Sequence, residues 1–340
     1  WEDKTSVRMS AAQLYELIFD GNNKWMLSAN GTIFTYEQEA VIPGLLKRWY
    51  AERKEMQQKM RDCGDNEIEK EYWDKRQLVK KINLNSLYGA ILNPGCRFFD
   101  IRIGQSVTLT GRCITKHMAS KVNEIVAGKY DHLGESIVYG DTDSVYFSAF
   151  KTLQKEIQDN MIQWTKDSVV GLYDKIAQEV NTSFTGFMSK AFHCPSTRGS
   201  VIKGGRELVA SKGLFITKKR YAVLYYDIEG NRTDTEGKEG KMKAMGLDLK
   251  RSDTPVFVQD FLSEILYMVL TGKNEQEVLE HITTFRAQFK SRPGWEKGSP
   301  KRANNMTKYT EAEEKQGRAN MPGHVRASMN WNKCREMYGD

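Results

Sequence analysis

The sequence predicts an α+β protein in which long helices alternate with short antiparallel strand pairs, giving a sheet backed by helices. Three observations support this fold class. Apolar residues recur at helical spacing through two long stretches between residues 43 and 91. Two short apolar segments flank an acidic turn at residues 141–143, as in a β-hairpin. Residues 201–228 alternate like further strands, and a helical pattern resumes after Thr254-Pro255.

The first half of the chain contains the clearest helix signals. Residues 1–40 mix short helical and strand-like pieces. A long amphipathic helix follows Pro43 and stops near residues 63–66. A second helix runs from about Glu67 to Ile91, before Asn93-Pro94-Gly95. Because the connecting loop is short, we expect the two helices to lie antiparallel.

The remaining elements follow in order. A third helix is expected from about Gln105 to Val126, where one apolar stripe recurs. The hairpin around residues 141–143 comes next, and a helix-rich stretch covers about 151–192. Strands between 201 and 228 are expected to break at Gly204-Gly205 and at Gly213. Helix is expected from 254 to about 289, then a polar, basic remainder with little periodicity, and we place a domain boundary near 248–254.

Composition narrows the class of protein. With 340 residues and 39% hydrophobic content, a wholly disordered chain is excluded. Between Arg198 and Lys250 there are 12 Lys and Arg against 7 Asp and Glu, interleaved with aromatic residues. This pattern favours a surface that faces phosphates, although an ordinary solvated basic face is equally compatible with it.

The cysteines and the apolar runs indicate the cellular compartment in which the protein works. The five cysteines never form a C-x-x-C pair, so neither a zinc site nor a disulfide framework is predicted. That usage is typical of a reducing compartment, and we expect a cytoplasmic protein. No apolar run approaches the roughly 18 residues of a membrane span, and no membrane partner is expected.

Asp141 and Asp143 are the first candidate site residues. They lie two residues apart at a strand-turn-strand junction, so both carboxylates can approach one site. Two hard oxygen ligands on a rigid hairpin suit Mg²⁺, which takes one or two protein carboxylates plus substrate phosphates. An ordinary Asp-rich turn is the alternative, since Asp favours turns in general.

The second long helix carries a candidate nucleotide-binding face. Lys81, Asn85 and Tyr88 follow one another at i, i+4 and i+7, which places a cation, an amide and an aromatic ring on one face. Such a face can bind a triphosphate, and the alternative is a solvated helix face with a core tyrosine. Arg53, on the preceding helix, can come level with Lys81 in an antiparallel pair and hold a phosphate bidentately.

Several strings together resemble one protein family. Residues 139–144 read Y-G-D-T-D-S and residues 81–89 fit K-x-x-x-N-S-x-Y-G. They resemble motifs C and B of the B-family DNA polymerases, and the string at 217–221 resembles that family's K-K-R-Y motif. Residues 243–246, followed by Ser252-Asp253-Thr254-Pro255, look like the family's next block. The matches occur in family order over about 40–255, and the flanks resemble the polymerases of large tailed phages.

The resemblance implies a right-hand polymerase architecture and a DNA-directed DNA polymerase activity. It places a palm-to-fingers connection at 1–29, fingers of two antiparallel helices at 30–95, a palm at 96–250 and an incomplete helical thumb at 251–340. The implied reaction is nucleotidyl transfer to a primer 3′-hydroxyl with two Mg²⁺ ions. Primer-template DNA and deoxynucleoside triphosphates are the implied partners.

The family's functional residues carry over position by position. Asp143 is implied as the stronger metal ligand and Asp141 as the weaker. In the family an Arg of an R-K pair contacts the γ-phosphate, which points to Arg53, with Arg48 and Lys54 as alternatives. Lys81 and Asn85 would bind the triphosphate, and Tyr88 would press on the nascent base pair.

The basic strings imply DNA contacts. Lys218, Arg220 and Tyr221 would follow the primer-template duplex without reading sequence, and Lys243 would face the primer end. Glu207 matches a family acid near the metals. The Asp expected two residues earlier is Gly205 here, so Glu207 is only a secondary metal candidate.

One family feature is missing. The second metal-binding Asp belongs to motif A, of the form D-x-x-S-L-Y-P-S, and this string does not occur in the sequence. We therefore expect half of a two-metal site, in the C-terminal part of a polymerase that is inactive without an N-terminal part carrying motif A. A subunit of a naturally split enzyme and a fragment of a longer chain both fit, and for a viral enzyme the expected location is the host cytoplasm. A sliding clamp is a further partner that the sequence leaves undecided.

Two other functions remain open from the sequence. A non-catalytic DNA-binding or assembly subunit of a replication complex would keep the basic surface, but it has no need of both Asp143 and Lys81. An RNA-directed or RNA-synthesising enzyme can carry a similar D-T-D turn, and sugar selection lies mostly in the absent motif A.

Overall fold

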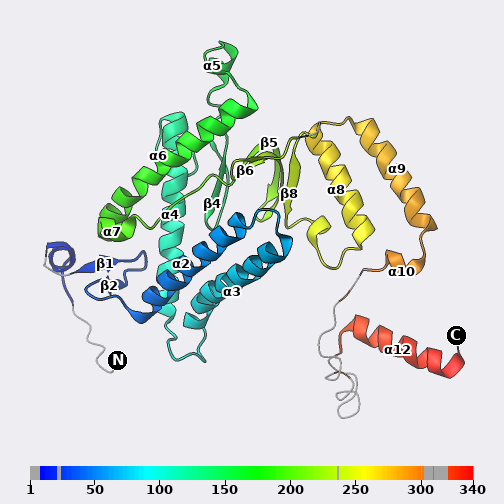
Figure 1. Cartoon of the computed structure of the whole chain (residues 1–340), viewed down its shortest axis with the longest axis horizontal. Coiled ribbons are helices and arrows are strands. Elements are labelled where there is room, and N and C mark those ends of the chain that lie inside the picture. The colour runs from blue at the N-terminus through cyan, green and yellow to red at the C-terminus, as the bar shows by residue number, and fades with distance from the viewer. Residues whose placement is uncertain are drawn as a thin grey trace. The chain divides into compact units, whose positions relative to one another are not determined.

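The computed structural model describes residues 8–20, 24–235, 237–299, 301, 309 and 321–339 (Figure 1). The chain forms two compact units, the first ending at Arg206 and the second starting at Glu207. The division between them falls inside the predicted palm, residues 96–250, and before the boundary expected near 248–254.

The first unit begins with small elements. α1 (Ala11–Tyr15) continues directly into a π-helical turn, η1 (Glu16–Asp20). β1 (Trp25–Leu27) and β2 (Ile33–Thr35) then form an antiparallel pair. The mixture of short helical and strand-like pieces expected for this stretch is confirmed for the part of it that the structure describes.

Two long helices form a hairpin. α2 (Val41–Asp62) and α3 (Glu67–Ile91) are joined by residues 63–66 and pack side by side along their lengths. The Asn66 side chain accepts a hydrogen bond from the backbone N–H of Glu69 and so caps α3. The predicted antiparallel pair is confirmed, although α2 begins at Val41, two residues before Pro43.

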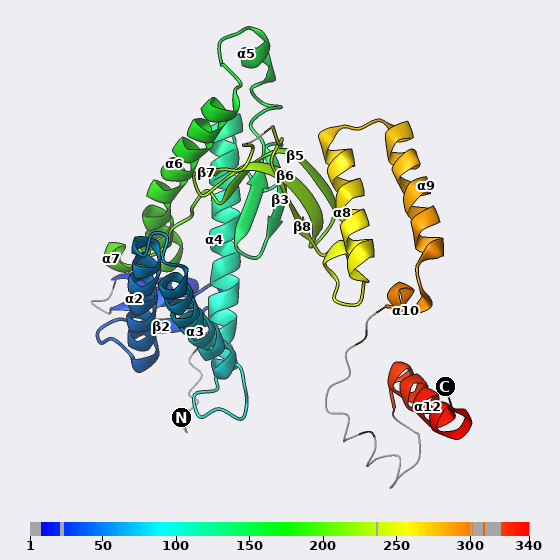
Figure 2. The ribbon, with the colours of Figure 1, turned by 45° about the vertical axis from the view of Figure 1, so that its right-hand side comes forward.

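α4 (Ile101–Ala127) and α6 (Lys166–Phe192) run side by side and form the core of this unit (Figures 1 and 2). α4 starts earlier than the expected Gln105, because the Asp100 carboxylate accepts a hydrogen bond from the backbone N–H of Arg102 and caps the helix. The buried side chains of this core come from both helices: Val122, Ile176, Val180 and Phe184.

The predicted acidic hairpin packs against this core. β3 (Ile137–Asp141) and β4 (Ser144–Phe147) pair antiparallel, and the side chains of Ile137 and Phe147 contact the α4/α6 core. α5 (Gln154–Gln158) lies between β4 and α6, and α7 (Ser196–Gly199) follows α6. The expected helix-rich stretch over 151–192 is confirmed.

The second unit contains an antiparallel sheet with a central strand. β6 pairs with β5 along one edge and with β7 and β8 along the other. The predicted break at Gly213 is wrong, because this residue lies inside β5, where an added Cβ would come 3.2 Å from a Val223 methyl carbon. The four strands are β5 (Leu208–Thr217), β6 (Arg220–Ile228), β7 (Asn231–Arg232) and β8 (Lys241–Met245).

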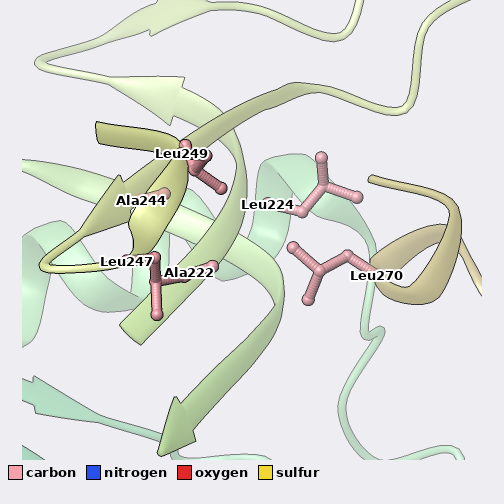
Figure 3. Packing of buried hydrophobic residues seen from close by; sticks show 6 residues of the cluster. All are labelled: Ala222, Leu224, Ala244, Leu247, Leu249 and Leu270. Carbon is pink, nitrogen blue, oxygen red and sulfur yellow. The ribbon is translucent and has the colours of Figure 1, made fainter. Parts of the chain in front are cut away.

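Helices follow the sheet. α8 packs on β5 and β6, and Leu270 of α8 contacts the same apolar cluster as Leu224 of β6 (Figure 3). The cluster is completed by Ala222, Ala244, Leu247 and Leu249. The expected helical region after Thr254-Pro255 is confirmed as two helices separated at Gly272, whose φ is +83°. The two long helices are α8 (Val256–Thr271) and α9 (Glu275–Ser291). The short turns η2 (Asp248–Lys250) and α10 (Gly294–Lys297) precede and follow them.

The polar remainder after about residue 289, where little periodicity was expected, still contains helices. Residues 323–338 form a helix, α12 (Gly323–Tyr338), which begins directly after Pro322. Its sequence lacks a continuous apolar stripe, so hydrophobic periodicity gave no signal there. Within the described parts of the chain, no helix is long and apolar enough to span a membrane.

Candidate active site

The acidic turn is a tight two-residue connection. Asp141 and Ser144 form the last pair of the β3/β4 ladder, so Thr142 and Asp143 make the turn. The Thr142 hydroxyl donates to Asp141 Oδ1 at 3.1 Å, and the Ser144 hydroxyl donates to the Asp141 carbonyl oxygen at 3.2 Å. We expected residues 141–143 to form the turn together, with both carboxylates able to approach one site. Instead Asp141 ends β3 and Asp143 belongs to the turn.

Thr142 has an unusual backbone conformation. Its φ is +50°, in the left-handed region that β-branched residues rarely occupy. The Thr115 hydroxyl of α4 donates to the Thr142 carbonyl oxygen at 2.9 Å. The turn is therefore held from outside the hairpin, by a 27-residue helix of the core that it packs against.

The two carboxylates differ in exposure. Asp143 is exposed at the tip of the turn, and Asp141 is half-buried beside it. The described residues include no group of three or more His, Cys, Asp or Glu side chains that could hold a metal ion together. Two carboxylates fit Mg²⁺ when substrate phosphates and water complete its octahedral shell, so the residues present suit such an ion.

The predicted nucleotide face of α3 lies in the same unit. Lys81 and Asn85 are exposed, and Lys81 makes no hydrogen bond or ion pair with any residue that the structure describes. The Tyr88 hydroxyl donates to the carbonyl oxygen of Gly104 in α4 at 3.2 Å. Apart from its chain neighbours and the nearby backbone of α3 itself, no described atom lies within 4 Å of the position that a Cβ on Gly89 would take.

Arg53 approaches α3 one helical turn away from Lys81. Its Nε donates to Gln77 Oε1 at 3.1 Å, and the neighbouring Glu52 forms an ion pair with Lys80 at 2.5 Å. Arg53 is half-buried between the helices. The expected approach of Arg53 to the Lys81 face is therefore offset by about one turn, close to 5 Å along α3.

The basic hairpin is in the second unit. Thr217 pairs with Arg220, so Lys218 and Lys219 form a second two-residue turn, and Lys219 has φ +62°. Arg220 Nη2 lies 3.7 Å from a carboxylate oxygen of Asp248. The Tyr221 ring is 7% exposed and stacks on Phe215, so it offers little surface for DNA contact.

Two further predicted residues lie in this unit. Lys243 of β8 donates to Glu207 Oε1 at 2.6 Å, so the secondary metal candidate already has a cationic partner. Gly246, directly after β8, has φ +62°, and an added Cβ would lie 2.0 Å from the carbonyl oxygen of Lys219. The loop after β8 therefore touches the backbone of the basic turn.

Comparison with known proteins gives the family. The model of DNA polymerase family B matches residues 5–292. The chain belongs to DNA polymerase family B. It is 31% identical to the DNA-directed DNA polymerase of Enterobacteria phage T4 over 252 residues, covering 68% of this chain. It is also 31% identical to the DNA-directed DNA polymerase of Escherichia phage RB69 over 245 residues, again covering 68% of this chain.

The matches extend to cellular members of family B. The catalytic subunit of DNA polymerase delta from rice is 28% identical over 247 residues, covering 72% of this chain. The matched region makes up 26% of each phage enzyme and 19% of the rice subunit. The chain thus spans about a quarter of the phage relatives. The resemblance seen in the motifs is confirmed at the level of the family.

Sequence reasoning missed several residues that contact the predicted site residues or their turns within each unit. Thr115 contacts the acidic turn from 27 residues away, and Gln77 receives Arg53 from the facing helix. Gly104 accepts from Tyr88, and Gly246 touches Lys219. None belongs to the motif strings on which the sequence predictions rested, except Gly246, whose contact depends on a distant strand turn. Of these features, only the positive φ of Gly246 could be anticipated locally, because glycine adopts positive φ without strain.

Proposed function

We propose that this chain carries the fingers, the palm and part of the thumb of a DNA-directed DNA polymerase that extends a primer 3′-hydroxyl. The proposal is supported chiefly by the acidic turn, in which Asp141 and Asp143 occupy a rigid hairpin tip fixed by α4. Membership of family B supports the same activity. The proposed parts are fingers at 30–95, a palm at 96–250 and a thumb from 251, with 1–29 as their connection.

Asp143 and, more weakly, Asp141 would hold Mg²⁺ at the hairpin tip. When bound, such ions neutralise charge on the phosphoryl group and on the attacking and leaving oxygens. Both carboxylates belong to a tight turn whose Thr142 and Ser144 hydroxyls are hydrogen-bonded to Asp141, so they need little rearrangement to accept ligands. We propose that a motif A aspartate, which these 340 residues do not contain, completes the site, so that activity requires a partner segment that supplies it.

The α3 face would bind the nucleotide. Lys81 is exposed and has no partner within the described residues, so its ammonium is available to a triphosphate. Arg53 would add a second cation after leaving Gln77, and Asn85 an amide. Tyr88 would form a wall of the base-pair pocket, in the position where Gly104 already holds its hydroxyl.

The second unit would grip the primer-template. Lys218 lies in the exposed turn and Arg220 directly follows it, so both can contact phosphates without reading sequence. Lys243 would face the primer end after exchanging Glu207 for a phosphate. Tyr221 contributes through its packing on Phe215, and any contact of its own with DNA is limited to its edge.

A primer-extension assay tests this function. The chain would be expressed with the reading frame adjacent to its own, and extension measured with and without Mg²⁺. We expect extension only when both products and Mg²⁺ are present, and loss of extension in Asp143→Ala. DNA binding without any extension would support the non-catalytic alternative, and unchanged extension by Asp143→Ala would refute the assigned metal site.

A further inference from the structure

The acidic turn depends on a side chain outside the polymerase motifs. We propose that Thr115 of α4 is a positioning residue, whose hydroxyl holds the Thr142–Asp143 peptide so that the Asp143 carboxylate is aimed for metal binding. This inference rests on the proposed function. It assigns to α4 a part in the metal site that the motifs do not reveal.

The bond acts on the peptide that leads into Asp143. Thr115 Oγ1 lies 2.9 Å from the Thr142 carbonyl oxygen and 3.1 Å from the Gly111 carbonyl oxygen one turn earlier in α4. The carbonyl of Thr142 and the N–H of Asp143 belong to one planar unit. Fixing that carbonyl therefore fixes the plane from which the Asp143 side chain departs.

The turn needs such an anchor. Thr142 has φ +50°, which an L-residue branched at Cβ adopts only when its surroundings compel it. The hydroxyl groups of Thr142 and Ser144 donate to Asp141, so these two bonds lie within the hairpin itself. Among the described residues, the bond from Thr115 ties this peptide to the core.

α4 is a firm support at this position. Its Ile114 packs into the α4/α6 core, and two residues beyond Thr115 the His117 ring is buried and stacked on Phe187 of α6 at 4.1 Å. The two ring nitrogens of His117 lie within hydrogen-bond distance of Tyr130 and Ser183. Thr115 thus starts from a helix segment that cannot shift without disrupting the core.

A cation-binding measurement tests the role directly. Tb³⁺ seeks oxygen ligands, and its emission is sensitised by nearby tyrosines; Tyr139 and Tyr146 flank this turn. The 340-residue chain would be titrated with Tb³⁺ alone, and Asp143→Asn would define the signal from this site. We expect Thr115→Val to weaken Tb³⁺ binding about fivefold, the effect of one net hydrogen bond.

The chain provides matched controls. Thr115→Ser keeps the hydroxyl and should bind Tb³⁺ within about twofold of the unchanged protein, since the bond survives. Thr108, on the same helix, donates only to the carbonyls of Gly104 and Gln105 within α4. Thr108→Val therefore removes a comparable hydroxyl without touching the turn and should change nothing. Thr115→Ala provides a second hydroxyl-free variant if the valine variant does not fold.

Kinetics in the complete polymerase provide a second readout. Misaiming one ligand should lower kcat about tenfold in Thr115→Val while the KM for the nucleotide stays within about twofold, because α3 is unaffected. The Mg²⁺ concentration at half-maximal rate should rise in parallel. A purely structural role would instead lower stability without this split.

The outcomes separate the two proposals. Loss of Tb³⁺ binding in Asp143→Asn together with unchanged binding in Thr115→Val and Thr115→Ala would overturn the role of Thr115 alone. Equal binding by Asp143→Asn and the unchanged chain would overturn the metal turn and the role of Thr115 with it. Weakened binding in both hydroxyl-free variants, with recovery in Thr115→Ser, supports the proposal.

Discussion

The acidic turn of the first unit and the basic turn of the second share a geometry and differ in how they are held. The acidic turn, Thr142-Asp143, and the basic turn, Lys218-Lys219, each connect antiparallel strands by two residues. Each contains a residue other than glycine at positive φ, Thr142 at +50° and Lys219 at +62°. Both therefore need support from another segment.

The supports act by opposite means. A hydroxyl of α4 bonds to the acidic turn, whereas Gly246 lets a loop press against the carbonyl of Lys219. The first support is lost by deleting a polar atom, and the second by adding a carbon. Strained turns of one length can therefore be stabilised either by a hydrogen bond or by the absence of a side chain, and the two kinds of support respond to mutation in opposite ways.

Adding a methyl group at Gly246 should have the largest effect. In Gly246→Ala the new Cβ would lie 2.0 Å from the Lys219 carbonyl oxygen, at φ +62°. We expect the free energy of unfolding of the second unit to fall by about 3 kcal/mol, from the combined clash and strain. Urea unfolding monitored by hydrogen exchange of the β6 amides measures this free energy.

Gly140 in the acidic hairpin is the matched control. Its added Cβ would meet only Ser144 O at 3.7 Å, an ordinary contact, and its φ is not left-handed. Gly140→Ala should cost less than about 1 kcal/mol. Equal costs for the two alanine variants would contradict the steric account of the basic turn.

Removing charge from the basic turn should affect DNA affinity next most strongly. The double change Lys218→Ala with Arg220→Ala removes two proposed phosphate contacts, so the slope of log affinity against log salt should fall by about 1.8. Fluorescence anisotropy with a primer-template duplex at several salt concentrations measures this. The exposed Lys155 of α5 serves as control: Lys155→Ala should leave the slope unchanged.

Acid should destabilise the first unit, which contains the acidic turn, before it destabilises the second unit. Burial, followed by the nearby Lys121 charge, lowers the pKa of His117 in α4. Near pH 6 the unfolded chain therefore binds more protons at this histidine than the folded chain does. The stability that depends on a neutral, buried His117 is present above the ordinary histidine pKa of about 6.5 and is lost as pH falls below it.

In the second unit the sign is the same but the pH range is lower. Hydrogen bonds from Arg251 and then Lys301 hold the pKa of Asp253 far below its usual range, so its contribution persists until the pH falls below about 4. Hydrogen exchange at pH 7, 6 and 5 should show α4 losing protection first. His117→Gln should flatten that dependence, and a dependence that survives it would exclude this histidine as the cause.

The smallest effect is expected for Asp248→Asn. Asp248 lies 3.7 Å from Arg220 and both side chains are about half exposed, so the pair should contribute less than about 0.5 kcal/mol to stability. Its removal should free Arg220 for phosphate and raise DNA affinity about twofold at low salt. Asp159→Asn, an exposed change on the first unit, should leave affinity as it was, and weaker binding by Asp248→Asn would argue against competition for Arg220.

Local signals account for what the sequence predicted well. α3 has the predicted bounds because Asn66 caps its start and Asn93-Pro94 stops it. The acidic hairpin was predicted from its apolar flanks, but the place of Asp141 at the end of β3 instead of in the turn depends on its pairing with Ser144. α12 escaped prediction because its apolar residues form no continuous stripe.

Non-local contacts account for what the sequence did not predict. Spacing placed Lys81, Asn85 and Tyr88 on one helical side, but the partner of Tyr88 is a backbone carbonyl, which every residue type carries. The bond from Thr115 joins two segments whose meeting depends on packing of α4 against the hairpin. No spacing rule within either segment reports such a contact.

The two bonds that α4 makes to the neighbouring motifs also constrain its length. Tyr88 bonds to Gly104 and Thr115 bonds to Thr142, and these anchor points are eleven residues apart. Eleven residues make about three turns, so the anchors share one side of the helix some 16 Å apart. One inserted residue between them would rotate one anchor by about 100° relative to the other. Between these points, therefore, α4 should tolerate many substitutions but no insertion or deletion.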